Sequence, residues 1–267
     1  MLSINTNVGA LIAQRFLREV NENLTITQNR LSSGLRVSSI TDDASTFAVA
    51  AGMRGDLKAY TAVTSALQGG VVAAQVAVSA GETISERLGD VQAKIVQLSN
   101  GSLTATQRDI YNADLQSMVA EVNSYLQQAG YAGYNLLGTG GSDLEVIANI
   151  DGSTLSVRNN NVAALDIDEI NNNGDANQAL ADLADFTASL DTALANLGAD
   201  ITRIDRQTEF VQRTEETVRI GLGALVDADI GRETAMLNSL TARQELAVEA
   251  IGIANSLPRI LLDLFRT

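Results

Sequence analysis

Apolar residues near the C-terminus recur mostly at spacings of three, four and seven residues, which places them on one stripe of a helix. Asp227 and Asp229 precede this pattern, where an acidic side chain caps a helix and suits the helix dipole. The spacing therefore predicts a terminal helix with an apolar face. The residues of this stripe are Ile230, Leu237, Leu240, Ala247, Ile251, Ala254, Leu257, Leu261 and Leu264.

A matching stripe runs along the N-terminal segment. Its residues are Ile4, Val8, Leu11, Leu17, Val20, Leu24, Leu31 and Leu35. Two narrow stripes at the chain ends predict an antiparallel helix pair that joins the termini. A pair of helices leaves much of such a surface exposed, and a contiguous exposed apolar patch usually marks an interface. An ordinary helical bundle is the alternative explanation of the same pattern.

The middle of the chain is also predicted to be mostly helical. A period near 3.5 residues predicts long helices across 58–137, the first of them beginning near Ala44 with Asp42 or Asp43 as its cap. Gly69 and Gly70 fall inside this helical pattern and indicate a site of close packing.

Residues 138–175 differ in composition from the segments around them. Two short runs of strand-like composition flank Asp151-Gly152, which predicts a β-hairpin. Residues 160–175 are interpreted as a polar connection. Helix is expected again over 176–221, and Gly221 and Gly223 are predicted to end it.

The predicted fold is mainly α, an elongated antiparallel coiled coil or helical-bundle rod with one small β-hairpin. Only one proline and 4% aromatic residues in 267 positions favour long, closely packed helices. The predicted parts are an inner terminal coiled coil (1–37 and 230–267), connectors (38–57 and 222–229), a helical rod (58–137 and 176–221) and a small hairpin or outer loop (138–175).

Charge and composition exclude several classes of function. The net charge is −14, and residues 139–200 contribute eleven acidic residues against Arg158 alone, so nucleic acid is not expected as a partner. The most apolar stretch, Val71–Gly81, is too short to span a membrane and contains Gln75, so no membrane contact is expected. The N-terminus lacks the features of a cleavable signal peptide, so a Sec-type export route is not expected.

The sequence offers no expected catalytic, cofactor-binding or metal-binding residues. The chain contains neither His nor Cys, which removes the commonest general base and all thiolate chemistry. Acidic residues at 166, 168, 169 and 175 do not have the spacing of a calcium-binding loop. We therefore expect a protein that is not an enzyme.

Four segments together resemble bacterial flagellin, the subunit of the flagellar filament. They lie at both chain ends in the expected order, and the resemblance extends over about 1–137 and 176–267. The segments are SINTN (Ser3–Asn7), RLSSGLRVSSITDDAS (Arg30–Ser45), LVDADIGRE (Leu225–Glu233) and IANSLPRILLDLFR (Ile253–Arg266).

This resemblance implies a structural protein of the bacterial flagellum that polymerises into a helical filament for swimming motility. It implies that the two terminal helices form the filament core and that the fifteen Ile, Leu and Val residues of the two stripes mediate assembly. It further implies secretion through the flagellar type III export apparatus with an export chaperone. The implied partners are further copies of the chain, sister flagellins, and the flagellar cap and hook-junction proteins.

Two other functions fit the same sequence features. A hook–filament junction protein of the same family would share the terminal helices but form only a short ring. A cell-surface binding protein could use the same helical rod, although the acidic middle segment does not indicate a ligand pocket.

Overall fold

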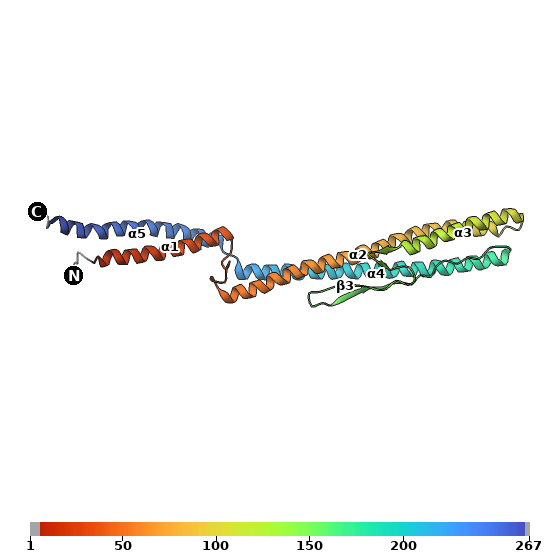
Figure 1. Ribbon diagram of the computed structural model, residues 1–267, viewed down its shortest axis with the longest axis horizontal. Coiled ribbons are helices and arrows are strands. Elements are labelled where there is room, and N and C mark those ends of the chain that lie inside the picture. Colours follow the sequence, from red (N-terminus) through yellow and green to blue (C-terminus); the bar gives the residue numbers. More distant parts are fainter. Residues whose placement is uncertain (1–5, 265–267) are drawn as a thin grey trace. The chain divides into compact units, whose positions relative to one another are not determined.

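The computed structural model describes residues 6–264, with side chains described as far as Ser256, and within that range it contains five helices and two small antiparallel hairpins (Figure 1). The chain divides into two compact units. We call the chain up to Gly55 and from Thr217 onward the terminal unit, and Asp56–Glu216 the central unit. The mainly α prediction is confirmed.

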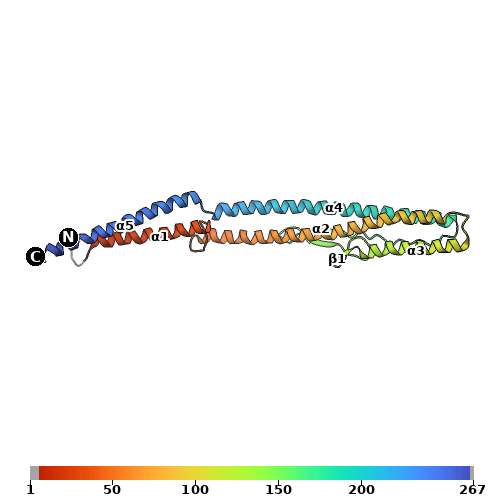
Figure 2. The ribbon, with the colours of Figure 1, turned by 90° about the horizontal axis from the view of Figure 1, so that it is seen from above.

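The terminal unit contains an antiparallel pair of helices, α1 (Val8–Ser33) and α5 (Ile230–Leu264). The two helices lie side by side in both views (Figures 1 and 2). Asn7 caps α1 by accepting a hydrogen bond from the Ala10 amide at 3.1 Å, and Gly34, with φ of +71°, ends it. The predicted pairing of the two chain ends is therefore confirmed over the described residues.

The two chain segments that leave the helix pair are joined to each other. The Arg36 amide donates to the Val226 carbonyl at 2.7 Å, and the Ala228 amide donates to the Gly34 carbonyl at 2.9 Å. The same segments contribute residues to a small apolar cluster. Its buried members are Val37, Ala50 and Val226, with Leu35, Phe47 and Leu222 packed against them.

Helix occupies much of the segments expected to be connectors. Helix α2 (Ala44–Leu98) begins at the predicted residue, but α4 (Asn173–Val226) continues through both Gly221 and Gly223. The prediction that these glycines end the helix is wrong. A glycine costs a helix only about 1 kcal/mol relative to alanine, and the packing of Leu222 and Val226 in the apolar cluster compensates for that loss.

The central unit packs α3 (Ala105–Gln128) and the intervening loops against parts of α2 and α4. Leu67, Ile84, Ile95, Leu115, Leu190 and Leu197 are among its fully buried side chains. A Cβ added at Gly81 would lie 2.6 Å from Leu194 Cδ2, and one at Gly70 would lie 2.7 Å from Val146 Cγ2. Close packing at Gly70 was predicted correctly, whereas Gly69 faces open space.

Helix α2 is also the described helix that is long and apolar enough to cross a membrane, with a mean hydropathy of 1.3 over 18 residues. The sequence prediction, which considered only Val71–Gly81, missed this property. Within the protein, α2 contributes the fully buried Leu67, Ala74 and Ala77 to the interior. About one third (33%) of the residues in that apolar window are buried within the protein.

The predicted hairpin around Asp151-Gly152 is present. Strands β3 (Leu144–Ile147) and β4 (Thr154–Val157) are antiparallel, with Leu144 opposite Val157. A second hairpin, β1 (Gly130–Tyr131) and β2 (Tyr134–Asn135), was not predicted. Its strands of two residues are too short to give an alternating pattern in the sequence.

The interpretation of residues 160–175 as a polar connection is wrong for most of their length. Val162, Leu165, Ile167 and Ile170 are each at most 3% exposed. This segment lies against α3, whose amide side chains bind its backbone. Its acidic and asparagine residues hide an apolar pattern that is too irregular to read as a strand or a helix.

Candidate functional site

The inner faces of α1 and α5 hold about half of the residues predicted to mediate assembly. Val20 is 3% exposed and Leu240 is 4% exposed, and the others are half-buried. Together with alanines and polar residues on the same face, they recur every three or four residues along each helix. This is the spacing of a two-helix coiled coil. We call this set the inner stripe. Its predicted members are Leu17, Val20, Leu24, Leu31, Leu237, Leu240 and Ile251.

Polar contacts within the pair fix which residues stand opposite each other. The Asn7 amide group donates to the Ala254 carbonyl at 2.8 Å. Gln244 Nε2 donates to Asn21 Oδ1 at 2.7 Å. Near the other end of the pair, Arg30 and Glu233 form an ion pair at 3.4 Å. Polar groups at such positions set the register of a helix pair.

Other predicted residues lie away from the inner stripe. Val8 and Leu11 are more than half exposed on α1, and Ile230 is exposed at the start of α5. Leu35 belongs to the apolar cluster of the connectors. Ile4 lies outside the described residues. Leu257, Leu261 and Leu264 lie on the part of α5 whose side chains are not described.

The sequence prediction missed a second apolar face on each terminal helix. We call these faces the outer stripes. They consist of Val8, Leu11, Ile12, Phe16 and Ile26 on α1 and of Leu246 and Ile253 on α5, all of them exposed. The signal was present in the sequence, because residues 8, 12 and 16 differ by four and residues 246 and 253 differ by seven. Tracing one stripe per helix merged the inner and outer faces of α1.

Two adjacent aspartates organise the segment that precedes α2. Asp43 Oδ1 accepts hydrogen bonds from the Ser45 and Thr46 amides, each at 3.1 Å. Bonds from the Thr46 hydroxyl and amide lower the pKa of Asp43 from 3.8 to about 2. Asp42 accepts from the Ser38 and Ser39 amides at 2.9 Å, and these bonds lower its pKa as well. Both carboxylates therefore serve the local fold.

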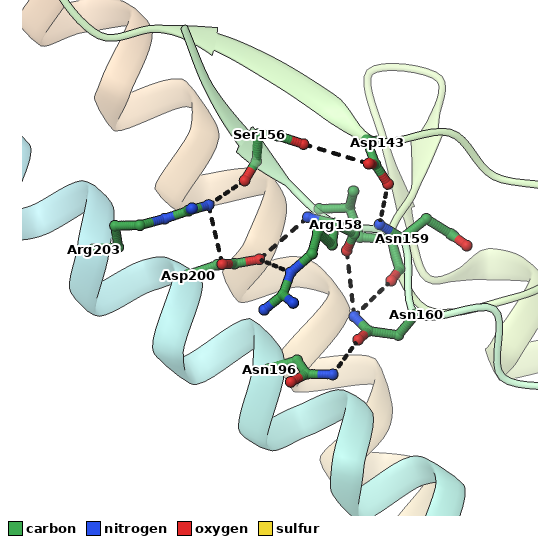
Figure 3. Close-up of polar contacts among 9 residues, drawn as sticks. Asp143, Ser156, Arg158, Asn159, Asn160, Asn196, Asp200 and Arg203 are labelled. Atoms are coloured by element: carbon green, nitrogen blue, oxygen red, sulfur yellow. Dashed lines mark hydrogen bonds and ion pairs between the residues drawn. The ribbon is translucent and has the colours of Figure 1, made fainter.

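A polar network in the central unit anchors the β3–β4 hairpin to α4 (Figure 3). The Asp200 side chain, only 4% exposed, accepts a hydrogen bond from the Arg158 amide at 3.2 Å and lies 3.1 Å from Arg203 Nη2. Arg203 also donates to the Ser156 carbonyl. The Ser156 hydroxyl in turn donates to Asp143 at 3.4 Å. Every group in this network has a structural partner.

The acidic residues between 163 and 185 line two shallow grooves of about 290 and 320 Å³, with Asp182 in both. Among the side chains described as far as Ser256, no group of three or more carboxylates is placed to hold a metal ion.

Both ends of the chain match known protein families. Residues 4–140 match the family described as the bacterial flagellin N-terminal helical region, and residues 180–265 match the bacterial flagellin C-terminal helical region. The flagellin of Brucella melitensis biotype 1 is 38% identical over 283 residues, which cover 100% of both chains. Flagellin FljO of Caulobacter vibrioides is 32% identical over 269 residues, covering 99% of this chain and 98% of that one.

A flagellin of Bacillus cereus of known structure is 18% identical, covers 54% of this chain and 86% of its own, and has a TM-score of 0.49. The sequence matches reach both terminal helices and extend over the full length of the relatives. The chain therefore belongs to the bacterial flagellin family, the non-enzymatic structural subunits that self-assemble into the flagellar filament, an extracellular appendage.

Proposed function

We propose that this chain polymerises through its terminal helices, with 1–37 and 230–267 forming the filament core. Residues 58–137 and 176–221 then form the surrounding helical rod, and 138–175 form a small outer loop. Residues 38–57 and 222–229 connect the core to the rod. The flagellar filament is assembled from many copies, so each copy must offer surfaces that only a neighbour can cover.

The observation that carries this proposal is the exposure of large apolar side chains on the terminal pair. Leu11 and Ile12 are each 55% exposed, and Ile253 is 67% exposed. Full burial of one such side chain contributes about 1.5–3 kcal/mol. Several of them buried between copies would outweigh the cost of ordering the helices, so the pair is stabilised by assembly.

The predicted assembly residues then have two separate roles. The inner-stripe residues hold α1 against α5, and the exposed Val8, Leu11 and Ile230 contact neighbouring copies. We propose that Ile4, Leu257, Leu261 and Leu264 extend these apolar stripes in the filament.

The same features support export as an unfolded chain through the flagellar type III apparatus. A two-helix pair with much exposed apolar surface has little stability of its own, and such a chain needs a chaperone that covers its ends before export. Sister flagellins and the cap and hook-junction proteins, which carry or receive similar terminal helices, are the partners proposed outside the cell.

Seeded assembly of the purified full-length chain tests the proposal. We expect filaments that sediment and are visible by negative-stain microscopy, with a gain in helical circular dichroism. The variant Leu11→Asp should not assemble, because a charge would be buried only between copies. The matched variant Ile110→Asp changes a similarly exposed residue of α3 in the central unit and should assemble normally.

Normal assembly of Leu11→Asp would show that the outer face of α1 does not contact a neighbour. Soluble wild-type chain under all seeded conditions would refute polymerisation. Short rings in place of filaments would favour a hook–filament junction role.

A further inference from the structure

We propose that Asn100 is a site of spontaneous covalent modification, at which the side-chain amide is lost and aspartate and isoaspartate are formed. The site lies in the turn between α2 and α3, where Asn100, Gly101 and Ser102 are all exposed to water. The reaction needs only the chain itself and water. It does not depend on polymerisation.

The attacking atom is the main-chain nitrogen of Gly101. It loses its proton to hydroxide and forms a bond to Cγ of the Asn100 side chain, which closes a cyclic imide. The bond from Cγ to the side-chain nitrogen breaks, and this nitrogen takes a proton from water and leaves as ammonia. Water then adds to one of the imide carbonyl carbons. Opening at the former side-chain carbon gives aspartate, and opening at the main-chain carbon gives isoaspartate.

Hydrogen bonds from Ser102 hold and polarise the Asn100 side chain. Asn100 Oδ1 accepts from the Ser102 amide at 3.0 Å and from the Ser102 hydroxyl at 2.8 Å. A side chain bonded to the amide two residues ahead is folded forward along the chain, towards the Gly101 peptide that attacks it. The same donors stabilise the negative charge that Oδ1 carries while the ring closes, as donors do in an oxyanion hole.

Other donors in the turn favour loss of the Gly101 proton. The negative charge of the deprotonated nitrogen is shared with the Asn100 carbonyl oxygen, because the peptide bond is conjugated. That oxygen accepts from the Leu103 amide at 3.3 Å and from Arg108 Nη2 at 3.5 Å, and a cation at this position stabilises the anion. A second bond, from Nη1 to the Leu98 carbonyl at 2.9 Å, holds Arg108 in place. Within the described part of the chain, the Gly101 amide donates no hydrogen bond that the reaction would have to break.

The chain contains one other Asn-Gly pair, Asn173-Gly174, which serves as an internal control. Both of its residues are exposed, so access to water does not distinguish the two pairs. Asn173 is the first residue of α4, and the Gly174 amide donates to Asn172 Oδ1 at 2.7 Å. Loss of the Gly174 proton would break this bond, and the adjacent Asp175 carboxylate would oppose the new negative charge. We therefore expect Asn173 to react more slowly than Asn100.

Incubation of the purified full-length chain at neutral pH, followed by tryptic peptide mapping with mass spectrometry, tests this difference. Asn100 is the only asparagine in the tryptic peptide 95–108, and a sample digested without incubation corrects for reaction during digestion. We expect Asn100 to lose its amide about tenfold or more faster than Asn173, which corresponds to about 1.4 kcal/mol in the barrier. In urea, where the turn is unfolded, the two rates should agree to within about threefold.

Substitutions around the turn separate its chemistry from its structure. Gly101→Ala places a Cβ beside the attacking nitrogen, where nothing lies within 4 Å, so it should fold normally and react about tenfold or more slowly. Arg108→Gln removes the cation and should slow the reaction by about threefold or more, whereas Arg108→Lys keeps the charge and should react faster than Arg108→Gln. The matched variant Arg206→Gln removes an exposed arginine of α4 and should react at the wild-type rate.

Two results would overturn the inference. One is an equal rate at Asn100 and Asn173 in the folded chain. The other is a slower reaction of Asn100 in the folded chain than in urea, because the turn would then protect the side chain. Neither result bears on polymerisation, which seeded assembly measures separately.

Discussion

Replacing Asn112 with alanine removes a buried contact that holds the extended segment 160–171 against α3. Asn112 is 5% exposed, and its side chain donates to the Ile170 carbonyl at 3.2 Å and accepts from the Ile170 amide at 3.1 Å. Ile170 is fully buried, so both backbone groups lose their partner in the variant. Each unsatisfied buried group costs about 1–3 kcal/mol. We expect the central unit to lose about 2–4 kcal/mol of unfolding free energy.

The matched variant Gln116→Ala removes a single bond, the one from Gln116 Nε2 to the Ile167 carbonyl at 2.7 Å. The expected loss of unfolding free energy is about 1 kcal/mol, because only one carbonyl is left without a hydrogen-bond partner and Gln116 is partly solvent-accessible. Asn112→Asp should resemble the alanine variant. A carboxylate keeps the bond from the Ile170 amide, but it cannot donate to the Ile170 carbonyl, and it places a charge at a buried position.

Hydrogen exchange and chemical denaturation of the unassembled full-length chain measure this effect. Exchange of the Ile170 amide should become faster in Asn112→Ala, and the denaturation midpoint of the central unit should fall more than in Gln116→Ala. Unchanged exchange at Ile170 together with an unchanged midpoint would show that the amide contacts do not stabilise the segment.

Three further predictions concern helix caps and glycines. The pKa of Asp43 is lowered to about 2 from an ordinary 3.8, so the ionised carboxylate stabilises the start of α2 above pH 3.8. This stabilisation is lost as the pH falls through about 2. The Thr46 amide resonance should therefore shift between pH 4 and 2 in nuclear magnetic resonance spectra, and in Asp43→Asn this shift should disappear. Gly81→Val should destabilise the central unit by about 1–3 kcal/mol through overlap with Leu194, as measured by denaturant unfolding. Gly89→Ala, at a helical position with nothing within 4 Å of the added Cβ, should stabilise it by about 0.5–1 kcal/mol, and a loss of stability there would contradict the described open space.

Features that depend on residues close together in the chain were predictable. The start of α2 at Ala44 follows from Asp43, whose carboxylate reaches only the next three residues. The hairpin of β3 and β4 follows from Asp151-Gly152, where Gly152 has a φ of +84° that few other residues adopt. Both signals act through the local backbone, so the rest of the fold does not change them.

Features that depend on distant residues were not predictable in the same way. The burial of Ile170 requires Asn112, which is 58 positions away in the sequence. The continuation of α4 through Gly223 requires the apolar cluster around Val37. In both places packing energy outweighs the local preference of the chain.

The sequence by itself determined that this chain is helical, that its two ends carry apolar stripes, and that it resembles flagellins. Helical periodicity and short motifs carry that information within a few turns of chain. Only the tertiary structure decided which apolar face of each terminal helix packs against the other helix and which face stays exposed. Leu17 and Leu240 are covered within the pair, while Ile12 and Leu246 remain exposed, because a helix buries only the side that faces its neighbour.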